Sequence, residues 1–151
     1  MASSPPSNRS ALLVLITGIS ALIALIGSFL PWAYAGEYSV RGTVGGGMFT
    51  LVLSAIALIM VFWATGRMGV NPRVRTSMGI AFACMLLVAL IGIINVADVQ
   101  QINIPGAEGI VDIGVSPGLW MVTILGVVGT LSALVALIMG GGTSGAAPGA
   151  A

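Results

Sequence analysis

The chain has 151 residues, of which 58% are hydrophobic and only 6% are charged. An ordinary soluble domain is about 25% charged, and a chain this poor in charge could not keep a soluble globule in solution. The composition therefore excludes a soluble enzyme. Five basic residues against four acids, with no histidine, provide no basic footprint, which excludes a nucleic-acid binder. The class that remains is a small integral membrane protein.

Four apolar stretches are long enough to cross a bilayer, whose core of about 30 Å takes about 20 helical residues. None contains an acidic or basic residue, and none shows the strict two-residue alternation of a barrel strand. They predict an all-α integral membrane protein with an antiparallel four-transmembrane-helix bundle over residues 11–140. The predicted spans are Ala11–Leu30, Met48–Thr65, Met78–Ala97 and Gly118–Gly140.

The charged residues separate onto two sides of the predicted bundle. Residues 1–10 and 141–151 are predicted disordered tails on one side, together with four of the five arginines. All four acids and Arg41 fall in the two loops on the other side. The positive-inside rule then predicts a protein of the cell (plasma) membrane with both termini on the cytoplasmic side. The four arginines, which would also meet lipid headgroups, are Arg9, Arg67, Arg73 and Arg75.

The pattern Ala33-Tyr34-Ala35 after the first apolar run resembles a signal peptidase site. The run is longer than the 7–15 residues that are usual in a secretory signal, so we favour an uncleaved first span. Cleavage would leave three spans with an external N-terminus. An intact mass measured on the purified protein distinguishes the two.

The two loops on the acidic side contain extended segments. Glu37–Arg41 lies in the first, and the second carries Ile102–Ile104 and Ile110–Val115 around a Pro105-Gly106 turn, which predicts a hairpin. Pairing of Tyr38–Val40 with that hairpin would give a small three-stranded β cap.

Small residues spaced four apart predict where helices approach each other, since close packing drives helix association in lipid. The first and fourth spans carry the richest stripes, so we expect these two helices to be in direct contact. The residues concerned are Ser20, Ala24, Ser28, Gly129, Ser132, Ala133, Ala136 and Gly140. A second set, the aromatic residues Trp32, Trp63 and Trp120, is expected to anchor the bundle at the two membrane interfaces.

Little in the sequence supports chemistry. No histidine is present, the single cysteine, Cys84, falls inside the third span as a small buried hydrophobe, and no span has an ionisable side chain. Asn95 and Asp98 could together cap a helix end or hold a water molecule. The hydroxyls in the spans are expected to bond to their own helices. We therefore expect no catalytic residue, no metal site and no cofactor, and do not expect an enzyme.

Two short motifs carry a family resemblance. Phe29-Leu30-Pro31-Trp32 closes the first span, and Pro117-Gly118-Leu119-Trp120 opens the last. With the Gly-rich outer loop, this pattern resembles small four-span membrane proteins of unknown function from high-GC Gram-positive (actinobacterial) bacteria. The resemblance implies no established activity. The chain lacks the carboxylate in the first helix of small multidrug transporters and the cysteine pairs of disulfide-forming membrane enzymes.

These observations predict a non-catalytic integral membrane protein. We expect an accessory or scaffold subunit of a larger membrane complex, or a self-associating bundle, whose partners are the lipid bilayer and a membrane protein or a second copy, and not nucleic acid. The alternative is a small oligomeric transporter or channel that uses hydroxyl and backbone groups in place of charges. Its polar groups would be Thr17, Ser20, Thr123 and Thr130.

Overall fold

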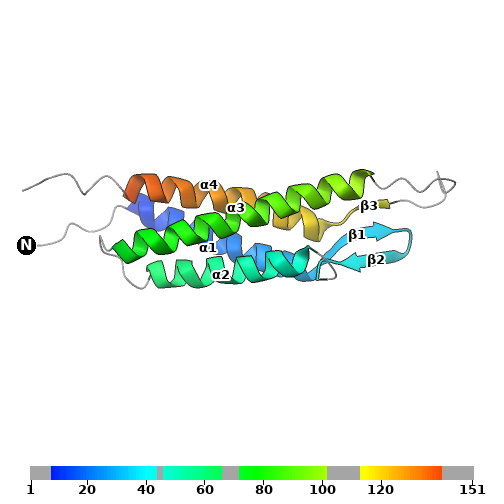
Figure 1. The fold of residues 1–151 in the computed structure, drawn as a ribbon, viewed down its shortest axis with the longest axis horizontal. Coiled ribbons are helices and arrows are strands. Elements are labelled where there is room, and N and C mark those ends of the chain that lie inside the picture. Colours follow the sequence, from blue (N-terminus) through cyan, green and yellow to red (C-terminus); the bar gives the residue numbers. More distant parts are fainter. Residues whose placement is uncertain (1–7, 44–45, 66–71, 102–112, 141–151) are drawn as a thin grey trace, which may run out of the picture.

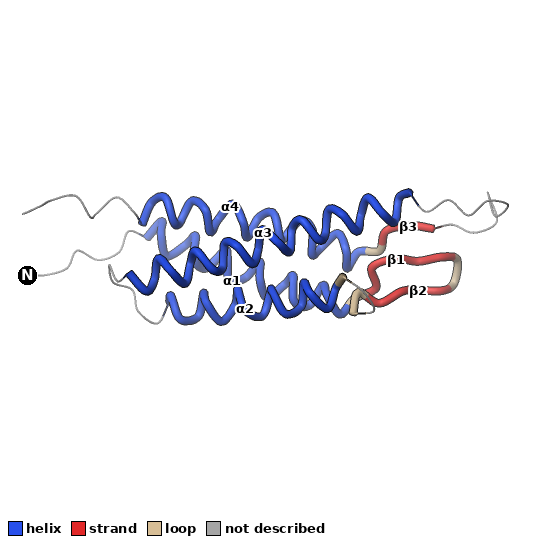
Figure 2. The backbone as a smooth tube through the Cα atoms, in the orientation of Figure 1, coloured by secondary structure: helices blue, strands red, loops and turns tan. Residues whose placement is uncertain are grey.

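The computed structural model describes residues 8–43, 46–65, 72–101 and 113–140, which form four long helices and three short strands (Figure 1). The helices are α1 (Asn8–Phe29), α2 (Gly47–Thr65), α3 (Pro72–Gln101) and α4 (Pro117–Gly140). The strands are β1 (Pro31–Ala35), β2 (Tyr38–Arg41) and β3 (Ile113–Val115). The strands lie together beyond one end of the helices (Figure 2).

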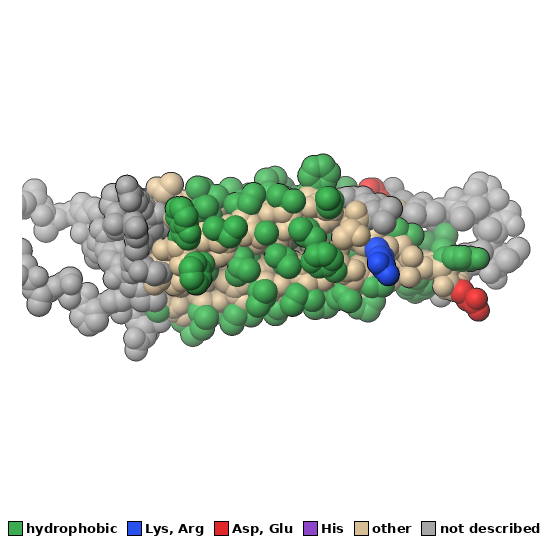
Figure 3. Space-filling model, turned by 90° about the horizontal axis from the view of Figure 1, so that it is seen from below, with side chains coloured by type: hydrophobic (Ala, Val, Ile, Leu, Met, Phe, Trp, Pro, Cys, Tyr) green, Lys and Arg blue, Asp and Glu red, His purple; other side chains and the backbone are tan. Residues whose placement is uncertain are grey.

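All four helices are long and apolar enough to cross a membrane. Only 33% of each apolar window is buried inside the bundle, so most of its apolar surface points outward. Apolar side chains cover the visible face along the length of the helices, and the charged side chains seen in this view gather near the strands (Figure 3). So large an exposed apolar surface would aggregate in water and is native to lipid. The chain is therefore a multi-pass membrane protein.

The helices pack in a closed ring. The helix α1 contacts α2 and α4, and α3 contacts the same two neighbours. The predicted four-helix bundle and the predicted contact of the first helix with the fourth are both confirmed. The start of α1 and the end of α4 lie at the same end of the bundle (Figure 1). We call this the arginine end, after Arg9 and Arg75, and the opposite end the sheet end.

Proline residues set several helix boundaries. Pro31 follows the end of α1, because the residue before a proline is disfavoured in a helix. Pro117 and Pro72 occupy the first positions of α4 and α3, where no backbone N–H donor is needed. Ser116 precedes α4 at the N-cap position, where its carbonyl accepts a hydrogen bond from the Leu119 N–H at 3.2 Å. The helix α3 extends beyond the predicted Met78–Ala97 span in both directions.

The sheet has the order β2-β1-β3, with both pairs antiparallel. The hairpin β1–β2 closes through Gly36, whose φ of 59° suits the first central position of a tight turn and is accessible to glycine. A small three-stranded sheet is present, as predicted. Tyr38–Val40 lies in β2, and the last three residues of the predicted Ile110–Val115 segment form β3. These two strands do not pair with each other; each pairs with β1, which was not predicted as a strand. The predicted hairpin through Ile102–Ile104 falls outside the described residues.

The buried core has two parts. The larger part, toward the arginine end, contains mainly alanine and methionine, including the fully buried Met85. Cys84 belongs to it with 7% exposure, as expected of a small buried hydrophobe. The smaller part, toward the sheet end, is built around Trp32, Leu119 and Val122. Alanine at so many contacts lets the helix backbones approach closely.

Candidate functional site

The small residues predicted to pack on α1 and α4 are buried, and Ser20 and Gly129 lie at the contact between these two helices. On α1, Ser20, Ala24 and Ser28 are buried, with exposures of 0–1%. A side chain on Gly129 of α4 would meet the Ser20 Cβ at 3.2 Å and also the tip of Met85 on α3, so this glycine faces two helices. The other predicted residues of α4, Ser132, Ala133 and Ala136, are buried as well, and Gly140 ends the helix at the edge of the described residues.

A buried pair of hydroxyls joins α1 to α4. The Thr17 Oγ1 and Ser132 Oγ atoms lie 2.9 Å apart, and both residues are buried. Each hydroxyl also reaches a carbonyl of its own helix, Thr17 that of Leu13 at 2.9 Å and Ser132 that of Gly129 at 3.1 Å. Because each hydroxyl has one hydrogen, one of them donates to its partner while the other donates to a carbonyl. We call this contact the Thr17–Ser132 pair.

A second pair joins α1 to α2 nearer the sheet end. The Ser28 Oγ and Thr50 Oγ1 atoms lie 2.9 Å apart, and both side chains are fully buried. Their carbonyl acceptors are those of Ala24 and Gly47, each at 3.0 Å. The two pairs tie α1 to both of its neighbours, at positions nearly three helical turns apart.

The Thr17–Ser132 pair should contribute a measurable coupling energy. In a double-mutant cycle of Thr17→Val and Ser132→Ala, we expect a coupling of about 0.6 kcal/mol, with roughly 1.7 kcal/mol as the upper limit for such bonds in membranes. Unfolding in mixed detergent, followed by circular dichroism, measures it. Thr130→Val is the matched control, because the Thr130 hydroxyl donates only to the Gly126 carbonyl of its own helix, at 2.7 Å. A coupling energy of zero in this cycle would show that the pair does not hold the helices together.

Other polar side chains of the helices bond to their own backbone, and one buried hydroxyl does not. Thr123 donates to the Leu119 carbonyl at 2.8 Å and Asn95 to the Ile91 carbonyl at 2.7 Å, both within one helix. Asp98 is exposed and Asn95 bonds to its own backbone, and a joint role of the two stays a prediction. The exception is Ser54, whose fully buried hydroxyl has no hydrogen-bond partner among the described residues.

The three tryptophans divide into two kinds. Trp63 and Trp120 are 65% and 45% exposed on the outside of the bundle, the arrangement that an interface anchor requires. The expectation was wrong for Trp32, which is only 5% exposed. Its indole N–H donates to the Gly27 carbonyl at 3.1 Å, and its ring lies directly against Gly42. The chain turns at Pro31 so that β1 directs the ring inward, where it closes the sheet end of the bundle.

The contact between α3 and α4 depends on two glycines that the sequence analysis missed. A Cβ on Gly126 would lie 2.8 Å from the Ala89 backbone nitrogen, and one on Gly92 would lie 3.0 Å from the Thr123 Cα. A glycine inside a helix lowers stability by about 1 kcal/mol relative to alanine. Gly92 and Gly126 could therefore have been read as positions where a side chain would not fit against a neighbouring helix. Gly79 of α3 makes no such contact, since no atom lies within 4 Å of a Cβ built there.

The described charges lie at the two ends. Arg9 and Arg75 are exposed at the arginine end, and Glu37, Arg41 and Asp98 are exposed toward the sheet end. Of the other predicted headgroup residues, Arg73 lies in the first turn of α3 and Arg67 falls outside the described residues. Within the part of the chain that the structure describes, no three His, Cys, Asp or Glu side chains come together as a metal site would require.

These features define a multi-pass membrane protein with a tightly packed four-helix interior and a small sheet beyond one end. No family model, no curated protein and no solved structure matches the chain.

Proposed function

We propose that this chain is a non-catalytic protein of the plasma membrane that acts as an accessory or scaffold subunit of a larger membrane complex, or as a self-associating bundle. The observation that carries the proposal is the closed interior. Its buried hydroxyls of Thr17, Ser132, Ser28 and Thr50 bond to one another and to backbone carbonyls, and Trp32 fills the sheet end. Because these polar groups of the interior are already hydrogen-bonded, we infer that the protein acts through contacts on its outer surfaces.

The orientation is part of the proposal. Arg9 and Arg75 are exposed at the arginine end, and Arg73 lies in the first turn of α3. In the sequence, Arg67 falls between α2 and α3. The positive-inside rule places this end, and both termini with it, in the cytoplasm. The sheet then projects to the outer side, where Tyr38 is 82% exposed and Val40 is 51% exposed. This is the surface we expect a partner to reach outside the bilayer.

A tagged full-length chain purified in mild detergent tests the assembly role. We expect one membrane protein to co-purify in stoichiometric amount, or a discrete homo-oligomer, as judged by mass spectrometry. A photo-crosslinking residue at Tyr38 should capture the partner if the sheet is the contact, and one at the 69% exposed Ile138 serves as the control at the opposite end. A monomer without a partner under these conditions contradicts the proposal.

The alternative function is an oligomeric transporter or channel, and one observation favours it. The Ser54 hydroxyl is buried without a hydrogen-bond partner in the described chain, one turn from the Ser28–Thr50 pair. A free hydroxyl among other hydroxyls is the start of a polar path. A pure homo-oligomer that passes ions in liposomes, and loses that flux on Ser54→Ala, would establish the alternative and refute the scaffold role.

A further inference from the structure

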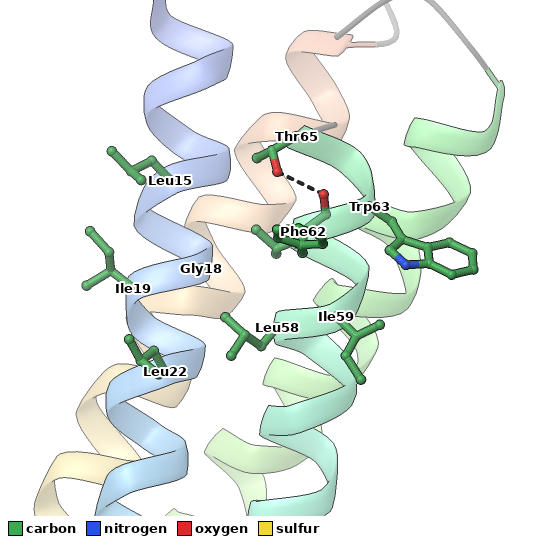
Figure 4. A pocket seen from close by; sticks show the side chains of 10 residues that line it. Leu15, Gly18, Ile19, Leu22, Leu58, Ile59, Phe62, Trp63 and Thr65 are labelled. Carbon is green, nitrogen blue, oxygen red and sulfur yellow. Dashed lines mark hydrogen bonds between the residues drawn. The ribbon is translucent and has the colours of Figure 1, made fainter. Parts of the chain in front are cut away.

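The described surfaces of the protein differ in what they can recognise. The open groove between α1 and α2 is lined almost wholly by apolar side chains, which need no partner other than the lipid around them (Figure 4). The strand β2 lies beyond the helices, and all four of its residues are exposed. It is an edge strand, because the described sheet has the order β2-β1-β3. An exposed edge strand is a template for pairing with another chain.

The main-chain groups of Ser39 in β2 point away from the rest of the sheet. A two-residue hairpin turn closes on a hydrogen-bonded pair, here Ala35 with Tyr38. Hydrogen-bonded and non-bonded pairs alternate along an antiparallel ladder, so the next residue, Ser39, directs its N–H and C=O to the opposite side of β2. No described strand lies on that side. The free edge of β2 is therefore centred on the donor and the acceptor of Ser39.

The side chains around Ser39 are complementary to those of a second copy. Consider two β2 strands paired antiparallel, with their Ser39 residues opposite each other. Glu37 of each copy then lies opposite Arg41 of the other, and Tyr38 lies opposite Val40; all of these residues are exposed. Opposite charges, and an aromatic residue facing a β-branched one, are favourable cross-strand pairs. A parallel pair in register would instead place Glu37 against Glu37 and Arg41 against Arg41, which is unfavourable.

The direction of the strands determines how the two copies are related. The strands β1 and β2 run roughly along the long axis of the bundle (Figure 1, Figure 2). Antiparallel pairing therefore reverses the second bundle, so that the two copies meet sheet to sheet and their helices point away from each other. Copies with the same orientation in one bilayer would present parallel β2 strands. Antiparallel pairing thus suits copies in two facing membranes.

We propose that β2 pairs with β2 of a second copy, antiparallel and centred on Ser39, and so joins two molecules head to head between two membranes. The two Ser39 residues exchange two main-chain hydrogen bonds, and the Glu37–Arg41 and Tyr38–Val40 pairs flank them. Such a short strand pair buries much less area than a permanent dimer, so the contact is transient and is strengthened by many copies facing one another. The inference rests on the proposed function, because it specifies how the self-associating form makes contact.

Disulfide crosslinking between nanodiscs tests this contact. The full chain with Ser39→Cys is placed, with two different tags, in separate phosphatidylcholine nanodiscs, which are then mixed under mild oxidant. We expect a disulfide-linked dimer that carries both tags, because opposed residues of a hydrogen-bonded antiparallel pair have Cα atoms about 5.5 Å apart, within the range for a disulfide. The unmodified chain is the control and should give no such dimer, since its one cysteine, Cys84, is buried in α3.

Charge reversal tests whether the partner is a second copy in this register. In the Ser39→Cys chain, Glu37→Arg alone or Arg41→Glu alone places like charges opposite each other at both ends of the pair. Both residues are exposed, so the fold should not change. Each reversal should lower the crosslinking rate about tenfold, since two favourable pairs become unfavourable. Mixing discs that carry Glu37→Arg with discs that carry Arg41→Glu should restore the rate, because opposite charges face each other again.

Three outcomes overturn the proposal. The first is the absence of a dimer with both tags in the Ser39→Cys chain. The second is a crosslinking rate that neither charge reversal changes. The third is a dimer that forms only between copies in the same disc, because those copies then meet side by side. The first and third leave the assembly role standing if the purified chain still brings down a membrane protein or forms a discrete homo-oligomer, so the two proposals fail separately.

Discussion

Replacing Trp32 with alanine is expected to cost about 3–5 kcal/mol of unfolding free energy, the range for removing a large buried aromatic side chain. The indole ring contributes to the core at the sheet end, together with Leu119 and Val122. Its removal leaves a cavity there and withdraws the donor from the Gly27 carbonyl. Loss of helical circular dichroism during titration with a denaturing detergent measures the change.

Two further tryptophan variants separate the contributions at this site. Trp32→Phe keeps most of the ring volume and loses the indole N–H, so its cost should approach that of one hydrogen bond, about 0.5–1.5 kcal/mol, with an added term for the smaller ring. Trp63→Ala is the matched control, because Trp63 is 65% exposed on the outside of the bundle. If Trp32→Ala and Trp63→Ala lose equal stability, then Trp32 does not close the interior.

Replacing Gly126 with leucine should lower the stability of the bundle by a similar amount, by overpacking a helix contact where Trp32→Ala leaves a cavity. The first atom of the new side chain would lie 2.8 Å from the Ala89 nitrogen and 2.9 Å from its Cα. These are backbone atoms, so α3 and α4 must separate to accept the change. Overpacking commonly costs 1–3 kcal/mol, and we expect about 3 kcal/mol or more here. A thermal melt in detergent measures the loss.

Neighbouring glycines provide the controls for Gly126→Leu. Gly129→Leu should weaken the bundle less, because the nearest obstruction is the terminal methyl of Met85, which can rotate away. Gly79→Leu should leave the melting temperature nearly unchanged, since no atom lies within 4 Å of a Cβ at that position. If Gly126→Leu melts as Gly79→Leu does, then α4 meets α3 through a different face.

The helices could be predicted because their signal is local. Each span is a long apolar run without charged residues. Pro31 marks the end of the first span and Pro117 the start of the last, because a proline restricts the backbone of its immediate neighbours. The contact between α1 and α4 could also be predicted, since small residues such as Ser20 on α1 and Gly129 on α4 recur at the helical period. In each case the residue type and the spacing were enough to give the structure.

The missed features depend on contacts between residues distant in sequence. An aromatic residue just after a span gives the same sequence pattern whether its ring faces lipid or turns inward. The position of the Trp32 ring therefore could not be predicted without knowledge of β1. That strand contains two alanines and was interpreted as a candidate cleavage site; it became recognisable only once β2 and β3 were found on either side of it. Likewise, the close approach of α1 to α2 where Gly18 faces Val61 involves two helices, and no pattern within one helix shows it.

The sheet has a mechanical consequence for the bundle. At the sheet end, the Ser116 N–H donates to the Trp32 carbonyl at 2.9 Å and so joins the two loops, together with the pairing of β1 with β3. Within the first loop, the Gly42 N–H donates to the Leu30 carbonyl at 3.1 Å. Toward the arginine end, the hydrogen bond between α1 and α4 that the described residues make is one of side chains, the Thr17–Ser132 pair. The main-chain bonds that link the α1 and α4 ends of the described chain therefore gather at the sheet end. We expect any separation of α1 from α4 to grow with distance from the sheet and to be largest at the end that the proposed topology places in the cytoplasm.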